Sequence, residues 1–144
     1  MSAAIQQTIL EWVNEGYEYL YQEQPERMHE LEEYLSHQRI YVNTIYRRTD
    51  WQPMLNAKPG DLIEVTRVSS WSQSSVMPDQ KYEGIPSVKL ILRHSNVRGV
   101  DVSQVSPFRG EREVLLAPCQ LFVETKINDI LEVKYVDRII EDMD

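Results

Sequence analysis

The sequence contains few residues that could crosslink the chain or bind a metal. There is one cysteine, Cys119, in 144 residues, so an internal disulfide is excluded. The three histidines, His29, His37 and His94, are scattered and do not form a cluster with the spacing of metal ligands. Cys119 lies between Pro118 and an apolar segment, which favours a small buried side chain over a nucleophile. We therefore expect neither a metal centre nor cysteine chemistry.

Positive charge is also scarce. The chain has 15 Lys and Arg residues against 23 Asp and Glu residues, which gives a formal net charge of −8 at pH 7. Non-specific binding to nucleic acid requires a surplus of Lys and Arg on one face of the protein. Nucleic acid is therefore not an expected partner.

Long apolar segments are missing as well. No apolar run approaches the length that crosses a bilayer, and residues 1–7 do not combine a basic segment with an apolar core. We expect no membrane partner and a cytoplasmic location, either by expression inside a cell or by delivery into one. The length suits a single domain, and 42% hydrophobic residues are enough to close one core.

The hydrophobic pattern changes once along the chain. Apolar residues recur every three or four positions from Ile5 to Leu20, which predicts an amphipathic helix, and Pro25 suits the first turn of a second helix. After residue 38, short runs rich in Ile, Val and Tyr alternate with turn residues, which is typical of strands. The fold class is therefore α+β, with helices in 1–37 and a mostly antiparallel sheet in 38–144. The strands are expected near 39–46, 61–69, 87–94, 112–117, 119–127 and 130–138.

Two carboxylates stand at the start of the fourth expected strand. Because side chains of a strand alternate between its faces, Glu111 and Glu113 would project from one side and Val114 and Leu116 from the other. This spacing places two acids in one cleft. The long irregular segment 72–87 is a further candidate for function, since loops of that length in a compact domain are usually functional or disordered.

Other polar residues follow the earlier strands in a suggestive order. Arg47 and Arg48 end the first strand, Ser70-Trp71-Ser72 ends the second, and Glu111-Arg112-Glu113 begins the fourth. This succession of an arginine, a Ser-x-Ser and a Glu-x-Glu resembles the mono-ADP-ribosyltransferase family, in its toxin-like branch that modifies arginine. The resemblance covers about residues 39–127. It implies a split sheet around a cleft for NAD, with NAD as the substrate and no metal.

The resemblance also implies roles for the residues before the glutamates. Arg47 would hold a phosphate or ribose of NAD, but Arg48 stands where many relatives have glycine, so either arginine remains a candidate. Ser70 would hold the catalytic carboxylate, and Ser72 belongs to the strand that supports the nicotinamide pocket. Tyr82, in the loop that follows, would cover nicotinamide or adenine.

The two glutamates divide the chemistry in this comparison. Glu113 would bind a ribose hydroxyl and stabilise the ribosyl cation, while Glu111 would orient and deprotonate an arginine of the target protein. The second role has a physical basis, because a guanidinium with a pKa above about 12 is not a nucleophile until a base accepts its proton. Phe108, in the preceding turn, would contact the target.

Two other functions remain open on the sequence alone. In an NAD glycohydrolase, water would take the place of the arginine acceptor. In a non-catalytic binding module of the same fold, Glu111 and Glu113 would be solvated strand residues, and the acidic helices would bind a partner.

Overall fold

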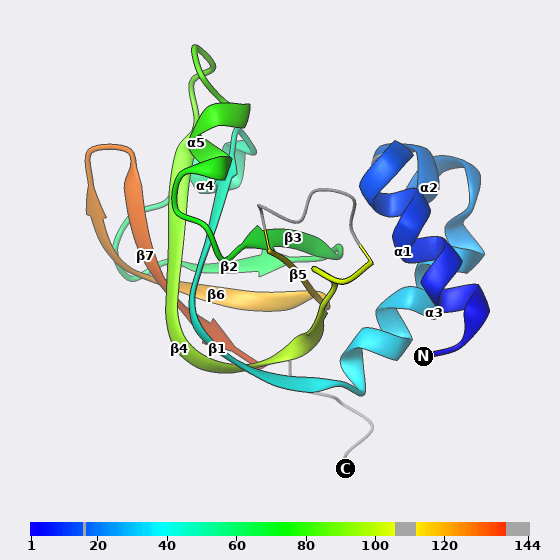
Figure 1. The fold of residues 1–144 in the computed structure, drawn as a ribbon. Coiled ribbons are helices and arrows are strands. Elements are labelled where there is room, and N and C mark those ends of the chain that lie inside the picture. Colours follow the sequence, from blue (N-terminus) through cyan, green and yellow to red (C-terminus); the bar gives the residue numbers. More distant parts are fainter. Residues whose placement is uncertain (16, 106–111, 138–144) are drawn as a thin grey trace.

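N-terminal helices lie beside a curved sheet of strands (Figure 1). The computed structural model describes residues 1–15, 17–105 and 112–137. Within these ranges, no helix has both the length and the apolar character needed to cross a membrane. The described chain therefore has the expected α+β order, with helices first and strands after them.

The helical layer differs in one respect from the expectation. Its elements are α1 (Ala3–Glu15), α2 (Tyr17–Glu23) and α3 (Pro25–Ser36). The segment predicted as one helix is thus divided into α1 and α2. The ring centroids of Trp12 and Tyr21 lie 6.4 Å apart, which is closer than nine residues of one continuous helix, about 13 Å, would allow. Pro25 occupies the first turn of α3, as predicted.

The strands follow the expected order with changed boundaries. The expected strand over 61–69 is divided between two strands, and the one expected from residue 87 continues to Asp101. The second half of this strand was missed because the polar run 93–96 interrupts the apolar residues that predict a strand. In the structure this half pairs with the first strand. A short helix interrupts the expected loop 72–87. The elements are β1 (Arg39–Thr49), α4 (Gln52–Leu55), β2 (Leu62–Val65), β3 (Ser69–Ser72), α5 (Met77–Lys81), β4 (Val88–Asp101), β5 (Glu113–Leu116), β6 (Cys119–Ile127) and β7 (Ile130–Val136).

The strand order in the described residues is β1-β3-β5-β4-β7-β6-β2, with an additional pairing between β1 and β4. These pairings are antiparallel except that of β4 with β7, so the sheet is mixed rather than simply antiparallel. The reason is that β6 and β7 form a hairpin, and its second strand is the one that lies beside β4 and runs in the same direction.

The topology brings the strands that carry the candidate residues together. β3 lies between β1 and β5, and the end of β4 pairs with β5 through Gly99 to Asp101. β5 is buried on both faces, since Val114 and Leu116 belong to the core of the sheet and Leu115 to the core beneath the helices. The segment that begins with Glu113 is therefore fixed between two apolar clusters.

A substitution at Gly99 should loosen β5. A Cβ atom built at residue 99 would lie 2.2 Å from the carbonyl oxygen of Leu115, which is backbone and cannot move aside without separating β4 from β5. We expect Gly99→Ala to lower the free energy of unfolding by about 2 kcal/mol. Urea unfolding measures this, with Asn96→Ala on the exposed side of β4 as the control. Equal stability of the two variants would contradict this packing.

Candidate active site

The register of β3 and β5 places the serines next to Glu113. Ser72 is directly opposite Glu113, and Ser70 is opposite Leu115, so Ser70 and Glu113 are diagonal neighbours on the same face. The hydroxyl of Ser70 donates a hydrogen bond to Oε2 of Glu113. The Glu113 side chain is thereby held against β3.

Arg47 completes this group from β1. Its Nη1 donates to the backbone oxygen of Ser70 at 2.8 Å. Strands from distant parts of the sequence therefore bring Arg47, Ser70 and Glu113 into one connected cluster. This is the arrangement that the sequence motifs predict.

Glu113 is buried, with 4% of its surface exposed. A carboxylate removed from water is costly unless it is hydrogen-bonded, and the Ser70 hydroxyl supplies one such bond. In the non-catalytic binding module considered above, Glu113 would be a solvated strand residue. Its burial does not agree with that expectation. Glu113 is therefore a buried and hydrogen-bonded acid, which the sequence alone does not reveal.

The cluster lines a cavity of about 450 Å³ between the helices and the strands. Trp12 and Val13 of α1 form part of its wall, and the segment from Val65 to Trp71 forms another. Its volume lies within the range of about 300–1,000 Å³ that is typical of ligand sites. The cavity therefore has the size of a binding site, with the buried carboxylate in its wall.

A smaller cavity of about 120 Å³ adjoins the larger one. Arg47, Ser70, Lys81 and Tyr82 line both, so the two cavities adjoin, and together they are called the cleft below. Ser72 lines the smaller part, where its hydroxyl accepts a hydrogen bond from the backbone N–H of Ser74 at 3.0 Å.

Arg48 has a different environment from Arg47. Its Nε donates to Asp79 at 2.9 Å and its Nη2 to Asp129 at 2.8 Å, and Nη1 donates to the hydroxyl of Ser87 at 3.0 Å. Arg48 therefore connects β1 with α5 and with the β6–β7 turn. Arg48 also lines the smaller cavity, whereas Arg47 lines both cavities, so the geometry favours Arg47 as the cation that faces a ligand.

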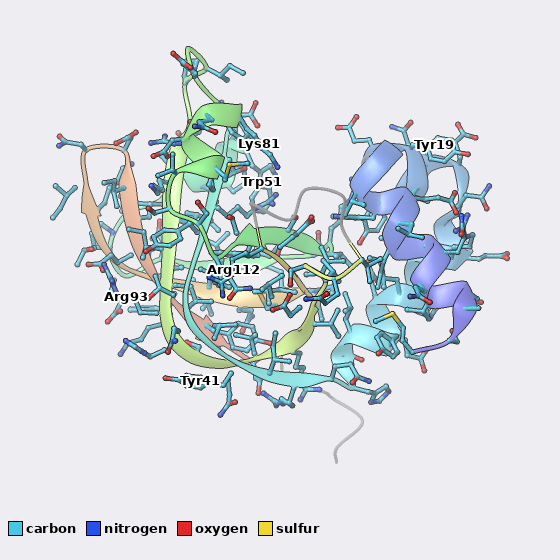
Figure 2. The ribbon with its side chains drawn as sticks, viewed as in Figure 1. Tyr19, Tyr41, Trp51, Lys81, Arg93 and Arg112 are labelled. Atoms are coloured by element: carbon cyan, nitrogen blue, oxygen red, sulfur yellow. The ribbon has the colours of Figure 1, made fainter. Side chains whose placement is uncertain are left out.

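Several cavity residues were missed by the sequence analysis. Arg67 lies in the β2–β3 connection, where its guanidinium is 4.6 Å from the ring centroid of Tyr21. Lys81 ends α5, and Trp51, which is 42% exposed, precedes α4 (Figure 2). The irregular composition of 72–87 was a signal for Lys81, but nothing local to the sequence distinguishes Arg67 or Trp51. These residues add positive charge and an accessible aromatic ring to the cleft.

Two of the sequence-predicted residues, Glu111 and Phe108, lie outside the described residues. Among those that the structure describes, no group of three or more His, Cys, Asp or Glu residues is arranged to hold a metal ion.

Comparison with solved structures identifies the architecture. The helices followed by this strand arrangement form the ADP-ribosyltransferase fold, shared with solved ADP-ribosyltransferases and ADP-ribosylating toxins at sequence identities of 14–16%. The fold that the motifs led us to expect is thus confirmed. No family model matches the sequence, and no curated protein matches it.

Three of these structures illustrate the similarity. The ADP-ribosyltransferase Vis, from Vibrio splendidus, matches with a TM-score of 0.69 and 15% identity over 94% of this chain and 74% of its own. Plx2a, an ADP-ribosyltransferase toxin from Paenibacillus larvae, gives 0.68 and 14% over 95% and 88%. C3stau2 from S. aureus, solved with NAD, gives 0.65 and 15% over 96% and 89%. Vis has also been solved in complex with agmatine, and that structure matches with a TM-score of 0.56 and 15% identity over 94% of this chain and 70% of its own.

Replacing Arg48 should reduce stability. The Arg48 side chain is 14% exposed, and Arg48→Met removes its bonds to Asp79 and Asp129. We expect a loss of about 1–2 kcal/mol in the free energy of unfolding, between the effects of surface and buried ion pairs. The control is Arg93→Met, which removes a single pair, with Glu132, from an arginine that is 54% exposed, and should cost less. An equal or smaller loss at Arg48 would contradict this anchoring role.

This loss should depend on pH. Burial of Asp79 opposes its ionisation, but hydrogen bonds from Arg48 and Lys89 outweigh burial and hold the pKa of Asp79 below its ordinary value. A carboxyl with a lowered pKa stabilises the fold above pH ~4, and this contribution disappears as the pH falls further. The stability difference between wild type and Arg48→Met should therefore shrink between pH 7 and pH 3 in urea unfolding. A constant difference would show that Asp79 does not carry the effect.

Proposed function

We propose that this protein is a mono-ADP-ribosyltransferase that cleaves NAD and transfers ADP-ribose to an arginine of a target protein. The observation that carries the proposal is the connected cluster of Arg47, Ser70 and Glu113 in the wall of the cleft, within the fold of the ADP-ribosyltransferases. We also propose that the protein acts inside a target cell, because it shares its fold with a toxin such as Plx2a.

The charge of the cleft supports NAD as the substrate. Arg47, Arg67 and Lys81 line it although the whole chain is acidic, and the pyrophosphate of NAD requires cations of this kind. The rings of Trp51 and Tyr82 offer apolar surfaces for nicotinamide or adenine. The neighbour C3stau2, solved with NAD, is consistent with this assignment.

The buried carboxylate suits the bond that must break. When the bond between nicotinamide and ribose breaks, its electron pair leaves with nicotinamide, and positive charge develops on the ribose. A fixed carboxylate beside the ribose stabilises that charge, as in glycoside hydrolysis. In our proposal Glu113 has this role and also binds a ribose hydroxyl, while Ser70 holds the carboxylate in place. Arg47 holds a phosphate or ribose.

The Glu-x-Glu pattern supports arginine as the acceptor of ADP-ribose in this proposal. A guanidine nitrogen of the target arginine attacks the ribose carbon, and Glu111 accepts the proton that this nitrogen loses. The neighbour Vis was solved with agmatine, which carries the same guanidine group as arginine. In the alternative glycohydrolase, water attacks the same carbon.

Glu113→Gln tests the chemical step. Glutamine has nearly the same shape but no charge, so we expect the rate of nicotinamide release to fall at least about 100-fold. The free energy of unfolding should change by less than about 1 kcal/mol, because glutamine can still accept the Ser70 hydrogen bond. The control is Glu124→Gln, an exposed acid on β6, which should leave both quantities unchanged. Normal turnover by Glu113→Gln would refute the proposed function.

Glu111→Gln tests the acceptor. We expect transfer of labelled ADP-ribose to agmatine to be lost, while nicotinamide release into water continues within about threefold, since deprotonation of a guanidinium is the step that needs this base. Glu113→Gln should remove both activities in the same assays. Equal loss of both in Glu111→Gln would contradict the assignment of Glu111 to the acceptor alone.

A further inference from the structure

The residue before Glu113 has an unusual backbone conformation. Arg112 has a φ angle of +50°, in the left-handed region that side chains rarely adopt. Such a conformation persists when the surroundings enforce it, and it is often found beside functional sites. The backbone that leads into the buried carboxylate is therefore held by its contacts.

Gln73 supplies several of these contacts. Its backbone N–H and its side-chain Nε2 both donate to the carbonyl oxygen of Arg112, at 3.2 and 3.1 Å. In return, Nη2 of Arg112 donates to Oε1 of Gln73 at 3.3 Å. One side chain thus holds Arg112 at its backbone and at its guanidinium.

Gln73 also reaches the end of β4. Its Nε2 donates to Asp101 at 3.1 Å, and Asp101 is fixed in turn by the backbone N–H and hydroxyl of Ser103, at 2.9 and 2.6 Å. Gln73 directly follows β3, which carries Ser70. The glutamine therefore joins the ends of β3 and β4 to the start of β5.

We infer that Gln73 is a positioning residue for Glu113, an inference that rests on the proposed function. The bond between Ser70 and Glu113 requires β3 and β5 to keep one relative position, and Gln73 joins the end of β3 to the residue just before β5. Gln73 is not among the described residues that line the cleft. In this inference it therefore acts through the position of the Glu113 carboxylate and not by contact with NAD. Misplacement of a catalytic group by about 1 Å can cost 100-fold in rate.

The charges around Gln73 explain why an amide is suited to this position. Burial raises the pKa of Asp101, but hydrogen bonds from Ser103 and Gln73, with the nearby charge of Arg112, lower it further than burial raises it. Asp101 is therefore an acceptor at neutral pH, as is the carbonyl of Arg112. A carboxylate at position 73 would meet both of these acceptors and could donate to neither of them.

The experiment compares Gln73→Met and Gln73→Glu with wild type in nicotinamide release at varied NAD concentrations. Gln73→Met keeps the length of the side chain and loses its donor, and should lower kcat roughly tenfold with KM for NAD within about twofold. Gln73→Glu also loses both donor hydrogens and adds a negative charge beside Asp101, so its kcat should fall at least as far at pH 8, again with KM for NAD within about twofold.

Gln120→Met is the matched control. Its amide bridges β6 and β2 by donating to Glu64 at 2.9 Å, far along the sheet order from β5, and its loss should leave kcat unchanged. Thermal unfolding verifies that each variant is folded, and if Gln73→Met is not, the kcat of Gln73→Glu decides.

The outcomes separate this inference from the function on which it rests. An active wild type with unchanged kcat in folded Gln73→Met or Gln73→Glu, or an effect on KM alone, would overturn the positioning role and leave the transferase proposal intact. A wild type that releases no nicotinamide would overturn both.

Discussion

The hydrogen bond from Ser70 to Glu113 is the interaction on which the site depends. It exists because β3 and β5 pair in a register that puts both side chains on one face, and because Arg47 holds the same stretch of β3 from the other side. A buried carboxylate needs such partners to remain in place. The packing of β5 between two apolar clusters fixes the strand, so the acid enters the cleft from a rigid element.

Residues next to the motif hold this arrangement together. Arg48 follows Arg47 in β1, yet it binds α5 and the β6–β7 turn, and so supports the segment that brings Lys81 and Tyr82 to the cleft. Gln73 follows the Ser-x-Ser motif and connects three strand ends. In each case a residue close in sequence to a motif residue connects the segments that surround the cleft.

Much of this could be read from the sequence, for physical reasons that also set the limit. Arg47, Ser70 and Glu113 stand at strand ends, where the period-two pattern and the motif order identify them. The mixed sheet and the division of the strand over 61–69 depend on pairing between distant segments, which local pattern does not encode. For the same reason Arg67, Trp51 and Gln73 were missed, since their roles come from tertiary contacts. The motif order favoured Arg47 but left Arg48 as an alternative.

The most direct test is a crystal structure with an NAD analogue in which a methylene group replaces the ring oxygen of the nicotinamide ribose, so that the bond to nicotinamide resists cleavage. The account predicts a ribose hydroxyl within hydrogen-bond distance, about 3 Å, of the Glu113 carboxylate, with the pyrophosphate or a ribose against Arg47. An analogue bound on another surface, or no binding at millimolar concentration, would contradict it.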